Sequence, residues 1–163
     1  MALTILQALK RIKHLDRKIK TSQERIAKWA SYIEPTEAPP QYEVKPLLQS
    51  VSDMLTERAQ LRHSIHVANV LHKVTYKDRE MSIDELLILR TVTVPGRVET
   101  LKLLRRKEKP YHLKDEKGEI KVVMQYDPKE RDRTVDALEN EVDEIDHILD
   151  DINITLDISS VTK

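Results

Sequence analysis

Residues 135–152 read VDALENEVDEIDHILDDI, and their apolar side chains recur at alternating steps of three and four residues. That spacing places the apolar side chains on one stripe of an α-helix and is typical of a coiled-coil seam. Asp127 followed by Pro128 is a favourable start for this helix. We therefore expect an acidic helix and a short extended tail within residues 127–158, with a packing seam made by Val135, Leu138, Val142, Ile145, Leu149 and Ile152.

A second seam lies near the other end of the sequence, in the basic segment 1–33. Isoleucine recurs there every seven residues, which again predicts a helix with a coiled-coil face. Ser22 is the weak point of this face, because it places a polar side chain at an alternate seam position. The isoleucines of the seam are Ile5, Ile12, Ile19 and Ile26.

The two seam segments carry opposite charges, although the whole chain has 28 basic and 28 acidic residues. Residues 1–33 hold eight Lys or Arg and two acids, whereas residues 127–158 hold twelve acids and three Lys or Arg. Opposite charges of this size attract. We therefore expect the two segments to attract each other, either within one chain or between subunits.

Between the seams, residues 34–46 contain four prolines and are expected to form a linker. Residues 46–109 are expected to form the central helices, interrupted by a β-hairpin at 73–81. Arg58 falls on the apolar stripe of the first central helix, where it is either a buried partner for an acid or a polar residue that sets the register. Pro95 and Gly96 predict either one kinked helix or two short ones.

Residues 110–126 are expected to form a second β-hairpin. Apolar residues alternate along its second strand at Ile120, Val122, Met124 and Tyr126. A protruding hairpin of this kind can bind a neighbouring protein by strand addition. This segment is therefore a candidate contact surface.

The composition favours long helices over a β-sandwich. Charged residues make up 34% of the chain, against about 25% in an ordinary globular domain, and there are only two Gly and no Phe. We expect a mainly α fold, an antiparallel helical bundle or coiled-coil hairpins with two short β-hairpins. Residues 1–163 are expected to form a single helical domain.

The sequence offers no catalytic signature. The chain has no cysteine, which excludes disulfides, thiolate metal sites and cysteine nucleophiles. Two glycines are too few for the phosphate-binding loops of nucleotide enzymes. His63 and His66 lie three residues apart, at a spacing that suits a metal, but no acid stands at the expected neighbouring position. We favour solvated or core-edge histidines, and expect no enzyme activity, no cofactor and no bound metal.

A basic cluster near the end of the central helices is a candidate contact for nucleic-acid phosphates. Basic residues also favour a helix C-terminus through its dipole, so a solvated or subunit-facing surface is the other interpretation. No aromatic residues accompany the cluster as a stacking platform, and we therefore favour the second interpretation. The cluster consists of Lys102, Arg105, Arg106, Lys107 and Lys109.

Membrane association is not expected. No apolar run approaches the ~18–20 residues that span a bilayer. At the N-terminus the charged residues follow the apolar ones, the reverse of the order in a signal peptide. We expect the protein in a virion or in the host cytoplasm.

The stretch 64–90 resembles a motif of the septicolysin-like family, small helical proteins of unknown function with bacterial and bacteriophage members. That motif is a helix ending in an Asn-containing turn, a short hairpin, then Thr/Ser-x-x-Glu-Leu-Leu and an Arg. The resemblance extends to an Asn-x-Thr segment after the acidic helix, at Asn153 and Thr155. The matching residues of the motif are Ile65, Asn69, Val74, Ser82, Glu85, Leu86, Leu87 and Arg90.

Seams without catalytic residues indicate a non-enzymatic structural or assembly protein that forms a homo-oligomer through its helices. The phage members of the resembling family imply a bacteriophage virion component, a capsid, neck or tail accessory, with other virion or assembly proteins as partners. The alternatives are a nucleic-acid-associated accessory protein, a septicolysin-like bacterial protein of unknown activity, and a metal-dependent enzyme that uses His63 and His66.

Overall fold

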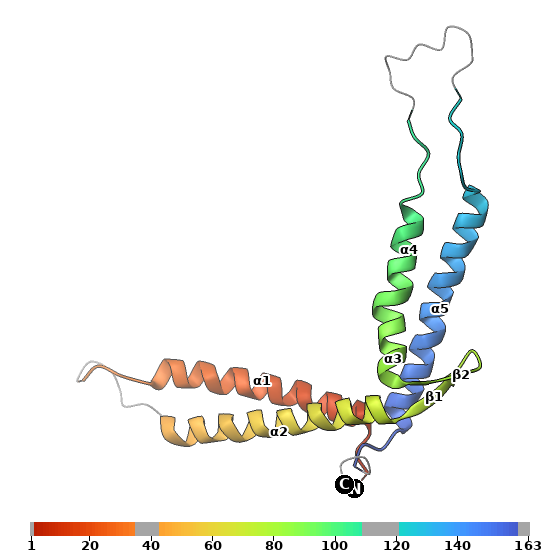
Figure 1. Cartoon of the computed structure of the whole chain (residues 1–163). Helices are drawn as coiled ribbons and strands as arrows, with labels where there is room; N and C mark the ends of the chain where they lie inside the picture. Colours follow the sequence, from red (N-terminus) through yellow and green to blue (C-terminus); the bar gives the residue numbers. More distant parts are fainter. Residues whose placement is uncertain (1, 35–42, 109–120, 160–163) are drawn as a thin grey trace. The chain divides into compact units, whose positions relative to one another are not determined.

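The protein is mainly helical in a computed structural model that describes residues 2–34, 43–108 and 121–159 (Figure 1). The chain divides into two compact units. The first unit comprises residues 1–83 and 150–163, and the second comprises residues 84–149. Each unit is built on a helical hairpin, as the two heptad patterns predict. The expected mainly α fold class with helical hairpins is confirmed, together with one of the two expected β-hairpins.

Helix α1, Ile5–Trp29, begins at a capping box. The Thr4 hydroxyl accepts a hydrogen bond from the Gln7 backbone N–H, and the Gln7 side chain accepts one from the Thr4 backbone N–H. These two bonds satisfy N–H groups that the first helical turn leaves without partners. The isoleucine stripe lies on the inner face of α1, with Ile5, Ile12 and Ile19 buried.

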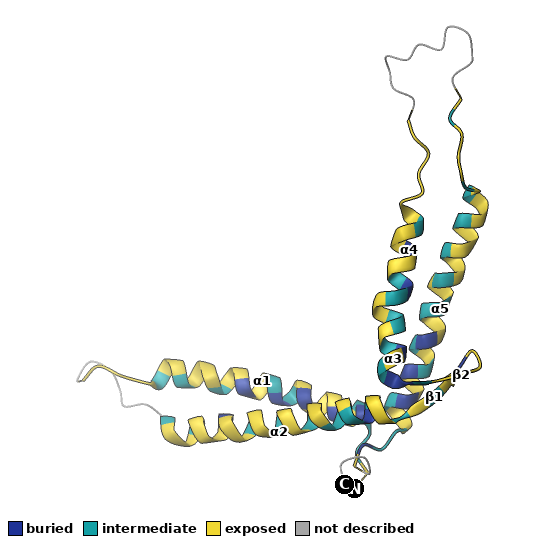
Figure 2. Cartoon of the chain, viewed as in Figure 1, coloured by how far each residue is buried: buried dark blue, intermediate teal, exposed yellow. Residues whose placement is uncertain are grey.

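Helix α2, Val44–Leu71, packs against α1, and Pro46 lies in its first turn, where a missing N–H costs nothing. The core between the two helices contains Leu15, Ile19 and Val51. Figure 2 shows buried segments on the side of α1 that faces α2. Partly buried Ile26, Met54 and Leu61 extend this core. Burial of these side chains contributes roughly 1.5–3 kcal/mol for each fully buried one.

Arg58 resolves one of the alternatives left open by the sequence. Its guanidinium pairs with the Asp16 carboxylate of α1 at 2.8 Å, and both side chains are partly exposed. Arg58 is therefore a partner for an acid at the edge of the seam. Because the pair is partly solvated, its contribution to stability is of the order of 0.5–1 kcal/mol.

A two-stranded antiparallel hairpin follows α2, as predicted for residues 73–81. Strand β1, Lys73–Tyr76, pairs with strand β2, Arg79–Ser82, so that Tyr76 lies opposite Arg79. The two residues between the strands, Lys77 and Asp78, have φ angles of 47° and 60°. Positive φ at both central positions is the requirement of a type I′ turn, whose twist matches that of the strands.

The second predicted hairpin, at 110–126, is not found in the part that the structure describes. Residues 121–126 belong to no strand, and Val123 is 82% exposed. Alternation of Val122, Met124 and Tyr126 was therefore an insufficient signal, because a strand also needs a backbone partner and a surface to cover. Ile120 lies outside the described residues.

The second unit contains α3, Ile83–Ile88, a π-helical turn η1, Leu89–Thr93, and α4, Val94–Lys102. The three elements follow without a gap, so the helix is continuous through Pro95. The Val94 N–H bonds the Leu89 carbonyl, five residues back. A proline ring clashes with the carbonyl four residues before it in a regular α-helix, and the wider π turn relieves that conflict.

Helix α5, Pro128–Thr155, starts at Asp127, whose carboxylate accepts a hydrogen bond from the Lys129 N–H at 2.8 Å. Helix α5 ends at Thr155, three residues beyond Ile152, the last residue of the predicted seam. The tail is extended, as expected: the Ile158 N–H bonds the Leu3 carbonyl at 2.9 Å, and Asp157 forms a β-bridge with Thr4. The chain end is thereby fastened to the residues that cap α1.

Candidate assembly surfaces

In the second unit, three polar contacts hold the α3–α4 helical run against α5. Arg90 forms a two-pronged ion pair with Asp146, one of whose bonds, from the Arg90 Nη2 to the Asp146 Oδ2, measures 3.0 Å. Lys102 pairs with Glu139 at 3.2 Å. Arg131 of α5 donates to the Leu104 carbonyl at 2.7 Å, just beyond the end of α4. These contacts fix which faces of the two helices meet.

The predicted α5 seam faces this contact unevenly. Ile145 and Leu149 are buried, and Ile152, in the first unit, is buried as well. Val135, Leu138 and Val142, toward the start of α5, are only half-buried. A two-helix hairpin covers a seam from one side, so part of its apolar surface is left in contact with water.

A shallow apolar groove of about 550 Å³ includes Leu138 from this half-covered part of the seam. Its lining consists of small residues, two leucines and one arginine. On α4 these residues recur three or four positions apart, which puts them on one helical face. The lining residues are Thr93, Gly96, Arg97, Thr100, Leu101, Thr134 and Leu138. We call this surface the apolar groove.

Large apolar side chains are also exposed elsewhere on the second unit. Val92 in the π turn is 64% exposed, and Leu103 after α4 is 73% exposed. The first unit exposes similar side chains, among them Ile33 and Leu71, so scattered exposure of this kind does not by itself mark an interaction surface.

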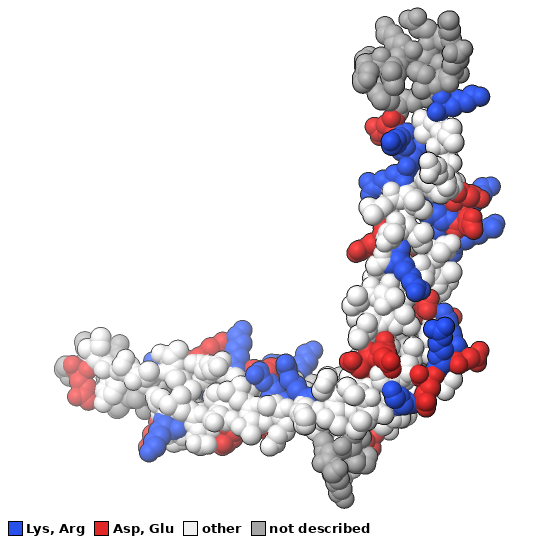
Figure 3. All heavy atoms as spheres, viewed as in Figure 1, with Lys and Arg blue, Asp and Glu red and all other residues white. Residues whose placement is uncertain are grey.

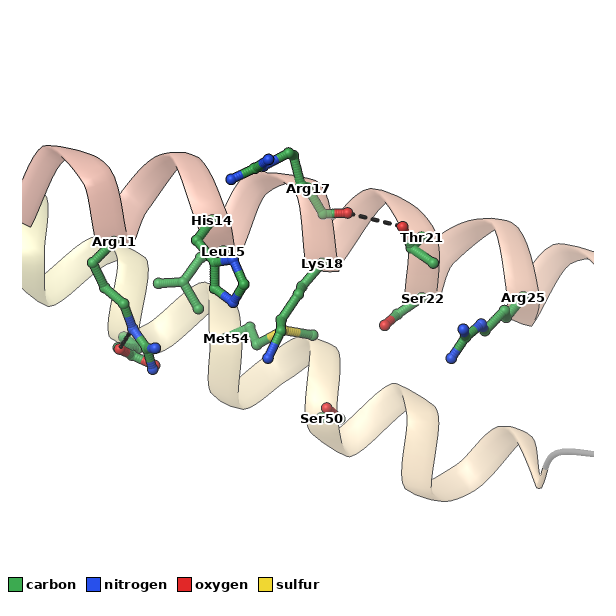
Figure 4. A pocket seen from close by; sticks show the side chains of 11 residues that line it. Arg11, His14, Leu15, Arg17, Lys18, Thr21, Ser22, Arg25, Ser50 and Met54 are labelled. Atoms are coloured by element: carbon green, nitrogen blue, oxygen red, sulfur yellow. Dashed lines mark hydrogen bonds and ion pairs between the residues drawn. The ribbon is translucent and has the colours of Figure 1, made fainter.

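The first unit has a different surface, a basic groove of about 580 Å³ between α1 and α2 (Figure 4). Arg11, Lys18 and Arg25 extend from α1 toward α2, whereas Arg17 points away from it. Ser22 and Ser50 are small, which leaves the space between the helices open. The weak seam position predicted at Ser22 thus coincides with a groove.

One carboxylate is already bound in the basic groove. The Arg11 guanidinium donates two hydrogen bonds to Glu57 of α2, at 2.7 and 3.2 Å. These bonds, helped by the charges of Arg11 and Lys18, hold the pKa of Glu57 below its usual value. The same bonds raise the pKa of Arg11. The groove lining is suited to carboxylates, because Arg and Lys bind them through charge-assisted hydrogen bonds.

The basic groove was missed in the sequence, although a signal was present. Arg11, Lys18 and Arg25 recur every seven residues, one position before the isoleucine seam. In a coiled coil such flanking positions select the partner by charge. The periodicity was assigned only to the isoleucines, and the cations were treated as a general basic face.

The other sequence-derived candidates lie apart from both grooves. His63 and His66 are exposed on α2, and within the described ranges no three or more His, Asp or Glu side chains gather as a potential metal site. Arg105, Arg106 and Lys107 are exposed beyond α4, and Lys109 lies outside the described residues. No helix in the described part of the chain is long and apolar enough to cross a membrane.

The ion pairs seen on the two oppositely charged helices lie inside the separate units. Arg11 and Asp16 of α1 pair with α2, and Glu139 and Asp146 of α5 pair with the α3–α4 run. Figure 3 shows acidic and basic side chains next to one another along each hairpin. The predicted attraction between α1 and α5 therefore remains a prediction.

Comparison with known families assigns residues 12–158 to a family of unknown function, DUF6847. The chain belongs to the DUF6847 family. Neither a curated protein nor a solved structure matches it. The DUF6847 match starts in α1 and ends in the tail after α5, so it includes residues of both units. The match does not support the expected link to septicolysin-like proteins. Of the expected resemblance, it confirms only that the chain belongs to a family of unknown function.

Proposed function

We propose that this protein is a non-enzymatic structural protein that assembles with copies of itself through the apolar groove of the second unit. The observation that carries the proposal is that the apolar groove includes Leu138, one of the half-buried residues of the α5 seam. A second α4–α5 hairpin laid on the first would cover this seam and complete a four-helix bundle.

Size favours a second copy as the occupant of the groove. Gly96, Thr100 and Thr134 are small enough for another helix to approach closely. A two-fold arrangement brings each patch against its equivalent, so the small residues of one copy meet those of the other.

The more specific proposal is that the assembly is part of a bacteriophage virion, as a capsid, neck or tail accessory that contacts other particle proteins. It rests on the resemblance of residues 64–90 to a family of small helical proteins with bacteriophage members. Genes for a portal, capsid or tail beside the gene for this chain would support this placement, and a conserved neighbourhood of metabolic genes would contradict it.

A double substitution tests the apolar groove, and a single substitution of the same type outside the groove is its control. Thr100→Arg together with Thr134→Arg places long charged side chains in it, and we expect light scattering coupled to size exclusion to show a shift from oligomer to monomer. The matched control is Thr91→Arg, outside the groove lining: like Thr100, Thr91 is exposed and donates its hydroxyl hydrogen to the carbonyl four residues before it. An oligomer that survives the double substitution, or dissociates equally in the control, contradicts the proposal.

A second candidate function, nucleic-acid association, is favoured by the four Lys and Arg side chains that line the basic groove. Phosphate contacts weaken steeply with salt. A gel shift with DNA and RNA over rising salt concentration tests this candidate, because binding that disappears with salt supports it and no binding at low salt excludes it.

A further inference from the structure

The basic groove contains an evenly spaced row of cations. Arg11, Lys18 and Arg25 are each exposed, lie on one side of α1 and are separated by seven residues. Seven residues of α-helix correspond to about 10.5 Å. We call these three residues the basic ladder.

An acidic row of the same spacing runs along α5. Asp136, Asp143 and Asp150 are each exposed and again lie seven residues apart. At 100° per residue this row lies on the side of α5 away from its packing seam. No Lys or Arg occurs between residues 134 and 159. We call the three aspartates the acidic ladder.

The two ladders match in number, spacing and length. Each has three rungs over fourteen residue steps, or about 21 Å of helix, and the charges are opposite. Two helices that lie side by side can therefore bring the three carboxylates opposite the three cations, in the way the flanking charges of coiled coils are arranged. The bond between Glu57 and Arg11 illustrates the chemistry, a carboxylate held on this row from a neighbouring helix.

We propose that the acidic ladder of α5 docks along the basic ladder of a second copy of this chain. Ser22 and Ser50 leave the groove open where the middle and last cations stand, so a helix edge fits there. The contact joins two different surfaces, so one copy still presents its basic ladder to a further copy and the other copy still presents its acidic ladder. Such a head-to-tail contact builds a ring or a filament.

This contact uses another surface than the apolar groove, so the two proposals can fail separately. Solvated ion pairs weaken as salt rises, whereas burial of apolar surface does not. Association that remains at high salt belongs to the apolar groove, and the part lost with salt belongs to the ladders.

A nucleic acid is the less favoured occupant of the basic groove. Phosphates along a strand present a closer and more continuous charge than one carboxylate every two helical turns. Glu57 also places a negative charge among the cations. The chain itself supplies an acidic helix of matching spacing, and the three carboxylates of its ladder equal in number the three cations of the basic ladder.

Reversing the charge of each ladder tests the pairing. One variant carries Lys18→Glu and Arg25→Glu, and the other carries Asp143→Lys and Asp150→Lys. Each alone presents like charges to itself, and we expect its self-association, measured by sedimentation at about 50 mM salt, to weaken about tenfold or more, as loss of two ion pairs implies. Mixed together, the variants again present opposite charges, and we expect association to return.

The matched control for the basic ladder is Lys13→Glu with Lys20→Glu. This pair has the same spacing and makes the same change in net charge, but its exposed residues lie outside the groove lining. If Lys18→Glu and Arg25→Glu disturb folding, Lys18→Gln and Arg25→Gln replace them, and circular dichroism monitors the helices. Association restored only in the mixture supports the proposal. It is overturned by equal loss in the control, by no restoration on mixing, by concentration-independent closure of single chains, or by retention of the wild-type assembly in every variant.

Discussion

At the scale of single residues, Pro95 and Gly96 are the positions at which the helical run of α3, η1 and α4 could have been interrupted. The π turn before Pro95 lets the helix continue, and Gly96 then lies exposed in the first turn of α4. A methyl group added at Gly96 would meet no heavy atom within 4 Å. The glycine therefore has no steric requirement in the isolated chain and lowers the stability of its helix.

Replacing Gly96 by Ala is expected to raise the free energy of unfolding by about 0.5–1 kcal/mol, because Ala loses less backbone entropy in a helix. Urea denaturation followed by circular dichroism measures this change. A substitution that destabilises the chain by a similar amount would show that the helix at this point requires a glycine.

At the scale of elements, the Arg90–Asp146 pair joins the π turn to α5. We expect a double-mutant cycle of Arg90→Ala, Asp146→Ala and the combined variant to give a coupling energy of about 1 kcal/mol, since both side chains are more than one-third exposed. Arg90→Lys should lose much of this coupling, because lysine cannot form the two-pronged bond. A coupling energy near zero would mean that α5 is held by its apolar seam alone.

The fastening of the chain end to α1 should depend on pH through Asp157. Hydrogen bonds from the Ser159 hydroxyl and N–H, and from the Leu3 N–H, hold the pKa of Asp157 below its usual value. A folded-state pKa below the unfolded one adds stability above about pH 4, and that stability is lost as the pH falls through the lower value. Asp157→Asn keeps an acceptor oxygen but does not titrate.

We therefore expect the melting temperature of the wild-type protein to exceed that of Asp157→Asn most clearly near neutral pH. The difference should shrink as the pH falls below about 4. Melting curves of the two proteins between neutral and acidic pH measure it. A difference that stays constant with pH would assign the effect to altered hydrogen-bond geometry and not to ionisation.

At the scale of the whole molecule, the sequence predicted the helices and the first β-hairpin, because seven-residue and two-residue periodicities report on burial along one element. It did not determine how the Pro95 conflict would be resolved, since a π turn depends on backbone bonds that have no residue signature. The failure at residues 121–126 has a related cause: alternation describes one strand, and pairing needs another.

The candidate surfaces also divide into features that the sequence predicted and features that it did not. The seam at Ile145 and Leu149 followed from its spacing, but the apolar groove required knowledge of which α4 face meets α5. The basic groove depends on the space left by Ser22 and Ser50, which belong to helices separated by a linker. Both ladders have a seven-residue spacing that is present in the sequence, but the sequence analysis did not distinguish them from the other charged residues of the two helices.

Sedimentation velocity of the purified full chain, over a range of micromolar concentrations at low and high salt, tests the central claim of self-assembly most directly. We predict species whose masses are multiples of the 19.0 kDa chain. The larger species should be lost as salt rises, and an oligomer held together by the apolar groove should remain. A species of 19.0 kDa at every concentration and salt would contradict it.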